Sequence, residues 1–129
     1  MSTNSLCKAE RLRGDRVFSF LFSKGSSFFQ TPYKVFWVKI AEPGLFPSCF
    51  AVSVPKKVFK SAVKRNLLKR RTREVFRTNK TILNEAINEG EQVHLAVVYS
   101  SDKLLPFADL EKAMKEILQH IAKQYAEVV

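Results

Sequence analysis

The strongest constraint on this chain is where its charge lies. Residues 56–80, KKVFKSAVKRNLLKRRTREVFRTNK, contain eleven Lys or Arg residues and a single acid, Glu74. The 129-residue chain has 22 basic and 12 acidic side chains, so the remainder carries no net charge and the formal +10 belongs to this segment. Self-repulsion at this density costs stability unless a partner neutralises it. The segment therefore indicates a surface that binds a polyanion.

The rest of the chain has the composition of a folded body that carries this segment. Its hydrophobic fraction of 46% and its eleven Phe residues exceed what disordered basic tails contain. A chain of this length can bury roughly 65 to 70% of its unfolded surface around one core. We expect residues 1–129 to form a single domain, with residues 1–8 loose.

The pattern along the chain predicts an α+β sandwich. A helix over 15–24 ends before Gly25, a short edge segment precedes Pro32, and the basic helix follows Pro55. Further expected elements are strands over 33–40, 48–55 and 92–100 and a packing helix within 106–129. The order is α-β-β-β-α-β-α, with one mostly antiparallel sheet of about four strands and three helices. The turn over 42–47 is expected to link antiparallel neighbours.

The strand over 33–40 is largely apolar on both faces. Lys34 and Phe36 share one face, because side chains alternate along a strand. Helices can cover one of the two faces. The other face leaves aromatic rings partly in solvent unless a ligand covers them.

The helix over 15–24 carries two apolar pairs at four-residue spacing. Phe18 and Phe22 lie on one face, and Val17 and Leu21 lie beside them. One pair can enter the core while the other lines a groove.

The basic helix has one face suited to phosphate contacts. At about 100° per residue, five polar residues fall within one arc: Asn66, Lys69, Arg70, Arg73 and Arg77. On the opposite arc Lys60, Lys64 and Arg71 stand among apolar residues that include Val63, Leu67, Leu68 and Val75. Either the stems of these bases cover the edge of the core, or more than one side of the helix contacts the partner.

Three alternative roles for the basic helix fit its residues less well. An ordinary solvated helix intersperses Glu with Lys, whereas this one has a single acid. A membrane-surface helix needs a broad hydrophobic face, and this stripe is broken. A helix-turn-helix needs a helix just upstream, where a strand is predicted.

Residues that could perform catalysis are scattered. Carboxylates for a metal or a His pair for acid and base work would need to cluster. None of the candidate residues lies at a sequence spacing from another that is typical of a metal site or a catalytic pair. The candidates are Asp15, Asp102, Asp109, His94, His120, Cys7 and Cys49. The two cysteines lack C-x-x-C spacing, and no apolar run reaches roughly 18 residues. We therefore expect a cytoplasmic protein that binds its partner and supplies no catalytic residue.

Residues 60–76, KSAVKRNLLKRRTREVF, resemble the protein subunit of bacterial ribonuclease P. Its signature A-V-x-R-N-x-x-K-R-x-x-R-E is matched by Ala62, Val63, Arg65, Asn66, Lys69, Arg70, Arg73 and Glu74. The segment RLRGDRVFSFLFSKG is similar to the N-terminal pattern of that family. Leu67 departs from the pattern, because that position is often basic in relatives.

The resemblance implies a sandwich with a left-handed βαβ crossover and a role in removing the 5′ leader of precursor tRNA. It implies that an RNA subunit performs the hydrolysis with magnesium bound mainly by the RNA, and that the protein supplies no catalytic residue or metal site. Whether Asp15 helps to hold a metal stays open. A structural RNA-binding protein of ribosomal type is the alternative.

Two sets of residues are predicted to bind RNA. The residues expected to bind the RNA subunit are Lys56, Lys57, Lys64, Arg65, Asn66, Lys69, Arg70, Arg73 and Arg77. The leader is expected to stack on Phe18, Phe22 and Phe36, since single-stranded bases stack on aromatic rings with little sequence preference. Lys34, on the strand face of Phe36, is placed to contact leader phosphates.

The charge count predicts a steep salt dependence. If about six to eight phosphates are neutralised, the logarithm of RNA affinity should fall against the logarithm of salt concentration with a slope of about −5 to −7. Filter binding between about 50 and 200 mM salt measures this slope. A slope near −2 would contradict a broad phosphate-binding surface.

Overall fold

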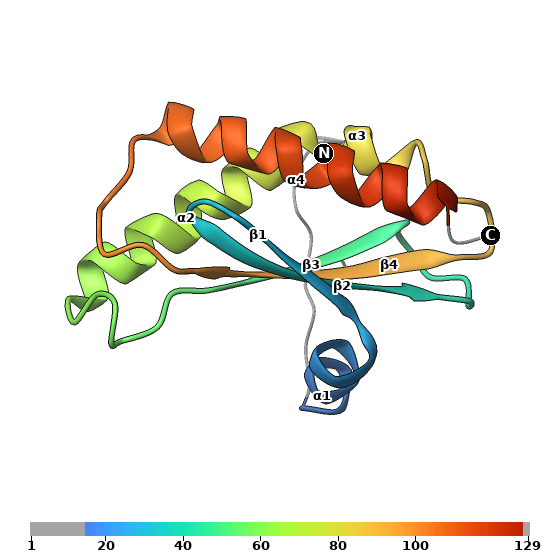
Figure 1. Ribbon diagram of the computed structural model, residues 1–129, viewed down its shortest axis with the longest axis horizontal. Coiled ribbons are helices and arrows are strands. Elements are labelled where there is room, and N and C mark those ends of the chain that lie inside the picture. Colours follow the sequence, from blue (N-terminus) through green and yellow to red (C-terminus); the bar gives the residue numbers. More distant parts are fainter. Residues whose placement is uncertain (1–14, 128–129) are drawn as a thin grey trace.

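The computed structural model describes residues 15–127 (Figure 1). The elements in chain order are α1 (Asp15–Lys24), β1 (Ser26–Gln30), β2 (Tyr33–Ile40), β3 (Ser48–Ser53), α2 (Ala62–Asn79), α3 (Thr81–Asn84), β4 (Gln92–Tyr99) and α4 (Phe107–Glu127). Helices α2, α3 and α4 cover one face of the sheet, and α1 lies on the other. The predicted elements are confirmed, with the four-residue α3 added. The predictions for residues 1–8 and for Cys7 fall outside the described residues.

The sheet is mixed, with the strand order β1-β2-β4-β3. β1 pairs with β2 and β2 with β4 antiparallel, whereas β3 and β4 are parallel. The expectation that the 42–47 turn links neighbouring strands is wrong, because β4 lies between β2 and β3. β4 takes this inner position because its side chains are largely buried on both faces, which suits a strand paired on two sides. The hand of the crossover from β3 to β4 stays a prediction.

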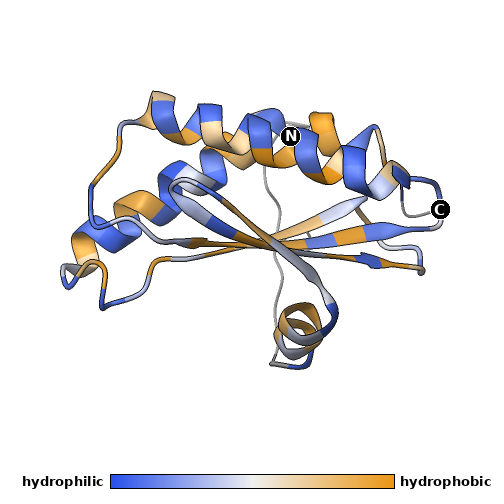
Figure 2. Ribbon diagram, viewed as in Figure 1, coloured by the Kyte–Doolittle hydropathy of each residue, from blue (hydrophilic) through white to orange (hydrophobic). Residues whose placement is uncertain are grey.

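The main core lies between the sheet and the two long helices. Tyr33, Val35 and Trp37 of β2 point into it, as their alternation predicts. The packing helix predicted within 106–129 is confirmed, since five apolar residues that share one face of α4 are all buried: Leu110, Met114, Ile117, Ile121 and Tyr125. Figure 2 shows apolar residues along the side of α4 that faces the sheet.

The basic helix α2 is held to the sheet by a ring stack and a buried hydrogen bond. The rings of Phe76 and Phe50 lie parallel, with centroids 4.2 Å apart. The hydroxyls of Thr72 and Tyr33 are 2.7 Å apart, and both residues are fully buried. Burial raises the pKa of Tyr33 far above its ordinary value, so the phenol stays protonated. These contacts fix which side of the helix faces solvent.

Removing the hydroxyl of residue 72 should destabilise the fold. Thr72→Val keeps the side-chain shape but leaves the Tyr33 hydroxyl buried without its partner, which should cost about 1–3 kcal/mol of unfolding free energy. Urea unfolding at pH 7 measures the change. The double variant Tyr33→Phe/Thr72→Val removes both partners and should recover part of the loss. A Thr72→Val protein as stable as the parent would contradict the predicted role of this hydrogen bond.

Candidate nucleic-acid interface

The segment between β3 and α2 presents lysines to solvent. The carbonyl oxygen of Pro55 accepts hydrogen bonds from the amides of Val58 and Phe59, at 3.1 and 3.2 Å. Phe59 is buried, with its ring 5.9 Å from that of Tyr99, and so anchors the turn to the core. Lys56 and Lys57 are exposed on this turn. The turn therefore holds two cationic side chains on a fixed backbone.

The start of α2 is closed by its own side chains. The Ser61 hydroxyl accepts a hydrogen bond from the amide of Lys64 at 3.3 Å, which is an N-cap. The Nη1 atom of Arg65 donates to the carbonyl oxygens of Phe59 and Lys60, at 2.7 and 2.8 Å. Arg65 thus stiffens the chain reversal, a structural role that spacing alone did not show. The positive end of the helix dipole adds to the lysine charges here.

The predicted phosphate-binding arc faces away from the core. Its five members are exposed or half-buried: Asn66, Lys69, Arg70, Arg73 and Arg77. The buried face of the helix is formed by Leu68, Thr72, Val75, Phe76 and Asn79. The division of the helix into two faces is confirmed, and the contact of the arc with RNA stays a prediction.

The single acid of the basic segment is paired with a base. Arg77 donates to Glu74 from Nε, at 2.9 Å, and from Nη2. These bonds lower the pKa of Glu74, so its carboxylate stays ionised at neutral pH. Part of the Arg77 charge is therefore offset within the protein.

The three basic residues on the opposite arc of the helix, Lys60, Lys64 and Arg71, divide into two groups. Arg71 is half-buried and donates from Nη1 to the carbonyl oxygen of Leu105 at 3.3 Å, so it ties α2 to the segment before α4. Lys60 and Lys64 are exposed, so their stems do not cover the core. Val63, which the sequence placed on the core side, is 79% exposed, because the first turn of α2 extends past the core.

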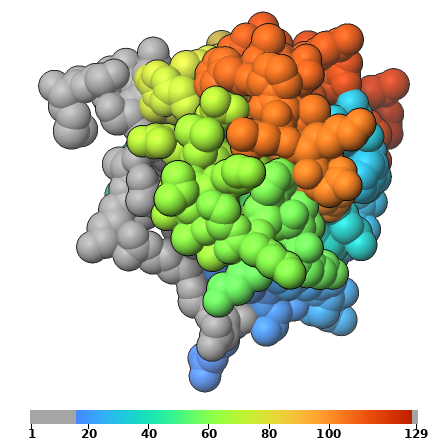
Figure 3. Space-filling model, turned by 90° about the vertical axis from the view of Figure 1, so that its left-hand side faces the viewer, coloured from blue at the N-terminus to red at the C-terminus, as the bar shows by residue number. Residues whose placement is uncertain are grey.

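Figure 3 looks at the end of the molecule where this segment lies. Side chains of the basic segment, in green, occupy the middle of that face, with α4 above and α1 and β1 below. Residues 56–80, whose exposed Lys and Arg side chains are here called the basic surface, therefore lie together on this end of the molecule.

Helix α1 is anchored on the opposite face of the sheet by one side chain. Leu21 is fully buried against Ala96 of β4, with Val17 packed beside them. Gly25 follows the helix at a point where a Cβ would lie 2.4 Å from the Leu21 carbonyl oxygen and 2.7 Å from that of Trp37. Only glycine allows this close approach of the backbone to β2. Leu21 is thus the residue of the two pairs that enters the core, with Val17 half-buried beside it.

The other pair of α1 joins an aromatic cluster with β2. The ring of Phe22 meets that of Phe36 edge to face, with centroids 4.8 Å apart, and lies 6.1 Å from the ring of Phe18. The Lys34 ammonium lies over the Phe36 ring, 5.4 Å from its centroid. Phe22 is 50% exposed, so it is not a core residue. The structure therefore brings all four predicted leader-binding residues together, here called the aromatic platform.

A row of paired residues joins the aromatic platform to the basic surface. Lys34 pairs with Val98 of β4, which pairs with Ser53 at the end of β3. Lys34 and Ser53 are exposed and Val98 is half-buried, so this row is open to solvent. The chain then passes from Ser53 directly to the turn that bears Lys56. A single-stranded nucleic acid could thus cross the sheet from the aromatic platform to Lys56 and Lys57.

Phe29 also belongs to this face, although the sequence assigned it no role. It pairs with Lys34 across the β1–β2 hairpin and is 59% exposed. Because Phe28 and Phe29 are adjacent, only the hairpin register decides which of them points to the platform. The signal in the sequence that could have identified Phe29 is the turn at Thr31 and Pro32, which pairs residues 26–30 with residues 33–37.

The other isolated candidates form no catalytic arrangement in residues 15–127. His94 is half-buried in β4, where burial lowers its pKa, and its Nε2 lies 3.2 Å from Gln92 Oε1. The ring of His120 packs on that of Phe28, with centroids 4.3 Å apart. No group of three His, Cys, Asp or Glu residues able to hold a metal occurs in this part of the chain. Within the same residues, no helix is long and apolar enough to cross a membrane.

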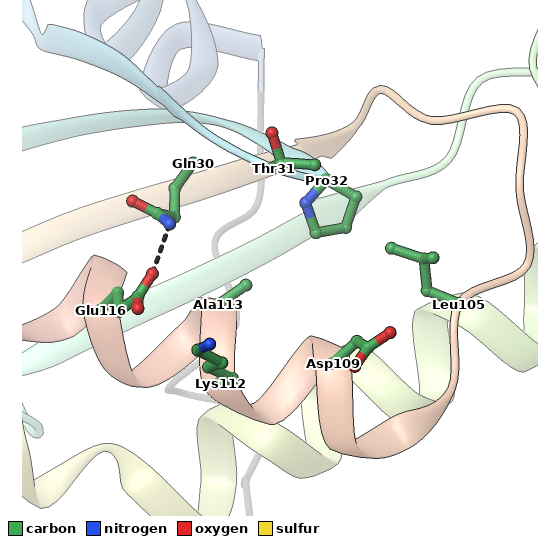
Figure 4. A pocket seen from close by; sticks show the side chains of 8 residues that line it. All are labelled: Gln30, Thr31, Pro32, Leu105, Asp109, Lys112, Ala113 and Glu116. Atoms are coloured by element: carbon green, nitrogen blue, oxygen red, sulfur yellow. Dashed lines mark hydrogen bonds between the residues drawn. The ribbon is translucent and has the colours of Figure 1, made fainter.

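A hollow of about 390 Å³ lies on the other face of the sheet, between the β1–β2 turn and α4 (Figure 4). Gln30 donates a hydrogen bond across it to Glu116. Its lining comprises Gln30, Thr31, Pro32, Leu105, Asp109, Lys112, Ala113 and Glu116. It contains none of the predicted RNA-binding residues, so the hollow and the aromatic platform are separate features.

Comparisons with known proteins agree with this geometry. The profile of the family Ribonuclease P matches residues 6–122. The chain belongs to the Ribonuclease P family. The "Ribonuclease P protein component" of Porphyromonas gingivalis (strain W83) is 37% identical over 122 residues, which is 93% of this chain and 88% of that protein. Membership makes the chain a bacterial-type ribonuclease P protein component that binds RNA and acts in tRNA 5′ processing.

Solved structures of this family share the fold. The ribonuclease P protein of Thermotoga maritima matches with a TM-score of 0.68 at 26% identity, over 86% of this chain and 96% of that one. The Staphylococcus aureus protein matches with a TM-score of 0.68 at 23% identity, over 90% and 97% of the two chains. The α+β assignment is confirmed.

Adding a methyl group at residue 25 should displace α1. Gly25→Ala forces the helix away from β2, which should cost about 1–3 kcal/mol of unfolding free energy and separate the Phe22 and Phe36 rings. Thermal unfolding and ring-to-ring NOEs measure the two effects. Gly90→Ala is the control: it adds strain at a φ of 84° in the loop before β4 but should leave the ring contact unchanged. Unchanged NOEs in Gly25→Ala would contradict the prediction.

Proposed function

We propose that the chain docks on the RNA subunit of ribonuclease P through its basic surface and holds the 5′ leader of precursor tRNA on the aromatic platform. The observation that carries this proposal is the meeting of Phe18 and Phe22 of α1 with Phe36 and Lys34 of β2. A protein that only anchors RNA by charge has no need of half-exposed rings beside a lysine.

The aromatic platform suits a single strand of any sequence. Ring stacking contributes about 1–3 kcal/mol per base and is available to every base. The Lys34 ammonium, held over the Phe36 ring, can neutralise a phosphate next to a base stacked there. Recognition by stacking needs no base-edge hydrogen bonds, so it would accept leaders of different sequence.

The basic surface suits the RNA subunit. Positive charge lies on Lys56 and Lys57 in the turn before α2 and on the outward arc of the helix. The helix is fixed to the core by the Thr72 and Phe76 contacts. Basic side chains on a rigid helix lose less conformational entropy on binding than those on a mobile segment. Arg65 and Arg77, which already bond within the protein, set the geometry of the surface as well as adding charge.

Hydrolysis is assigned to the RNA subunit, with magnesium held mainly by RNA. Magnesium bound there would activate the attacking water and stabilise the charge that develops at phosphorus. Magnesium is usually held by one or two carboxylates together with phosphates, and the described residues include no group of three His, Cys, Asp or Glu that could hold it without RNA. The residues of this chain bind and position the leader. A cytoplasmic location belongs to the same proposal, as does the lack of contact with DNA or membrane.

A structural RNA-binding role of ribosomal type is the competing function. It accounts for the basic surface but not for the rings of Phe18, Phe22 and Phe36. The two functions differ in whether the protein assists cleavage.

Cleavage of precursor tRNA at low magnesium tests the proposal. Adding the protein to the RNA subunit should raise the cleavage rate there. Arg73→Glu should weaken binding to the RNA subunit by about tenfold or more through lost charge, whereas Phe18→Ala should mainly weaken binding of leader-containing substrate by about tenfold. Lys112→Glu on α4 is the control for charge reversal away from the interface.

Two outcomes would count against it. Cleavage that is unchanged by the protein at low magnesium would exclude an assisting role. Equal losses of both affinities in Arg73→Glu and in Phe18→Ala would remove the division between the basic surface and the aromatic platform.

A further inference from the structure

Phe29 is an exposed aromatic residue on an edge strand and lies outside both apolar clusters of the described residues. Its neighbour Phe28 packs against the main core and the ring of His120. Phe29 instead points to the opposite face, is 59% exposed, and makes no ring contact within residues 15–127. Large apolar side chains on an edge strand promote unwanted association, and an exposed ring that adjoins other exposed rings marks a candidate binding surface.

The hairpin register places Phe29 in line with the aromatic platform. It pairs directly with Lys34, so the two Cβ atoms lie about 4.5–5.5 Å apart. Phe36 is two residues beyond Lys34 on the same face, which makes it the diagonal neighbour of Phe29 at about 7–8 Å. Lys34 therefore stands between two rings, and its ammonium lies over one of them.

The arrangement of a ring, a lysine and a second ring matches two neighbouring nucleotides, in which a phosphate stands between two bases. The diagonal spacing is about twice the 3.4 Å rise of a stacked strand, so an extended strand can place one base at each ring. The phosphate that joins two such nucleotides falls at the lysine between them. The exposed row from Lys34 to Ser53 leaves this side of the sheet open to the backbone of the strand.

We propose that Phe29 is a further leader-binding residue, which stacks on the nucleotide next to the one held at Phe36, with Lys34 contacting the phosphate between them. The inference rests on the proposed leader-binding function of the aromatic platform. The ligand is single-stranded RNA without a required sequence. Phe29 thereby lengthens the bound part of the leader by one nucleotide.

An abasic scan of the leader tests the proposal in the reconstituted holoenzyme. Precursor tRNAs that each lack one leader base are bound to enzyme made with the parent protein or a variant. In the parent, removing the base that stacks on Phe29 should weaken binding by about 5- to 100-fold. In Phe29→Ala that penalty should vanish at this one position, and in Phe36→Ala it should vanish at the adjacent position.

Further variants distinguish loss of ring stacking from a loss of stability of the fold. Phe29→Leu keeps apolar bulk in β1 and should behave like Phe29→Ala, whereas Phe29→Tyr keeps the ring and should retain the penalty. Phe107→Ala removes a 40% exposed ring on the helix-covered side and should leave the whole scan unchanged.

The outcomes distinguish this inference from the proposed function. If Phe36→Ala abolishes the penalty at one leader position while Phe29→Ala and Phe29→Leu leave every penalty intact, the role of Phe29 is wrong and the aromatic platform stands. If no variant of either residue changes the scan, leader binding by the aromatic platform fails as well. If Phe29→Ala and Phe36→Ala abolish the binding penalty at the same leader position, the assignment of a separate nucleotide to each ring is contradicted.

Discussion

The sheet has apolar side chains on both faces, and the amount of cover that each face receives shapes the molecule. On one face, α2 and α4 bury Tyr33, Trp37 and Phe50 completely or nearly so. On the other, the ten-residue α1 is pinned only where Leu21 meets Ala96. So short a helix cannot cover the whole face. The aromatic platform forms where α1 meets the uncovered part of β2, and its rings stay partly exposed because α1 covers them only in part.

The basic helix satisfies two demands that normally conflict. It buries one face through Phe76 and the Thr72 hydrogen bond, while the opposite face carries the charge of the protein. Some of that charge also serves the fold, since Arg65 closes the turn before the helix and Arg71 reaches the segment before α4. Repulsion among the remaining basic side chains is tolerated because the core contacts hold the helix, and RNA bound at this helix, as proposed, would relieve it.

The two surfaces proposed to bind RNA are joined through the pairing of strands. Lys34 and Ser53 lie in one row because β4 stands between β2 and β3. The basic segment leaves the sheet at the end of that row. A shift of one residue in either register would turn these side chains to the other face and separate the rings from the lysines. The position of β4 therefore matters to function as well as to the fold.

Features that are periodic and local could be predicted from the amino-acid sequence. Alternation in β2, the stripe of α4, the two faces of α2 and the four-residue spacing of Phe18 and Phe22 all follow from repeats within one element. The motif that begins at Ala62 identified the family for the same reason, because it lies in one continuous stretch. This information was enough to name the four residues of the aromatic platform and the basic arc.

Features that depend on residues far apart in the chain required the packed structure. The insertion of β4 between β2 and β3, the exposure of Val63 and the internal bonds of Arg65 appear only once the strands and helices are packed. Phe29 is the clearest case, since alternation alone cannot tell whether it or Phe28 faces the platform until the hairpin pairs it with Lys34. Periodicity fixes the faces of an element, whereas pairing and packing between elements fix what each face meets.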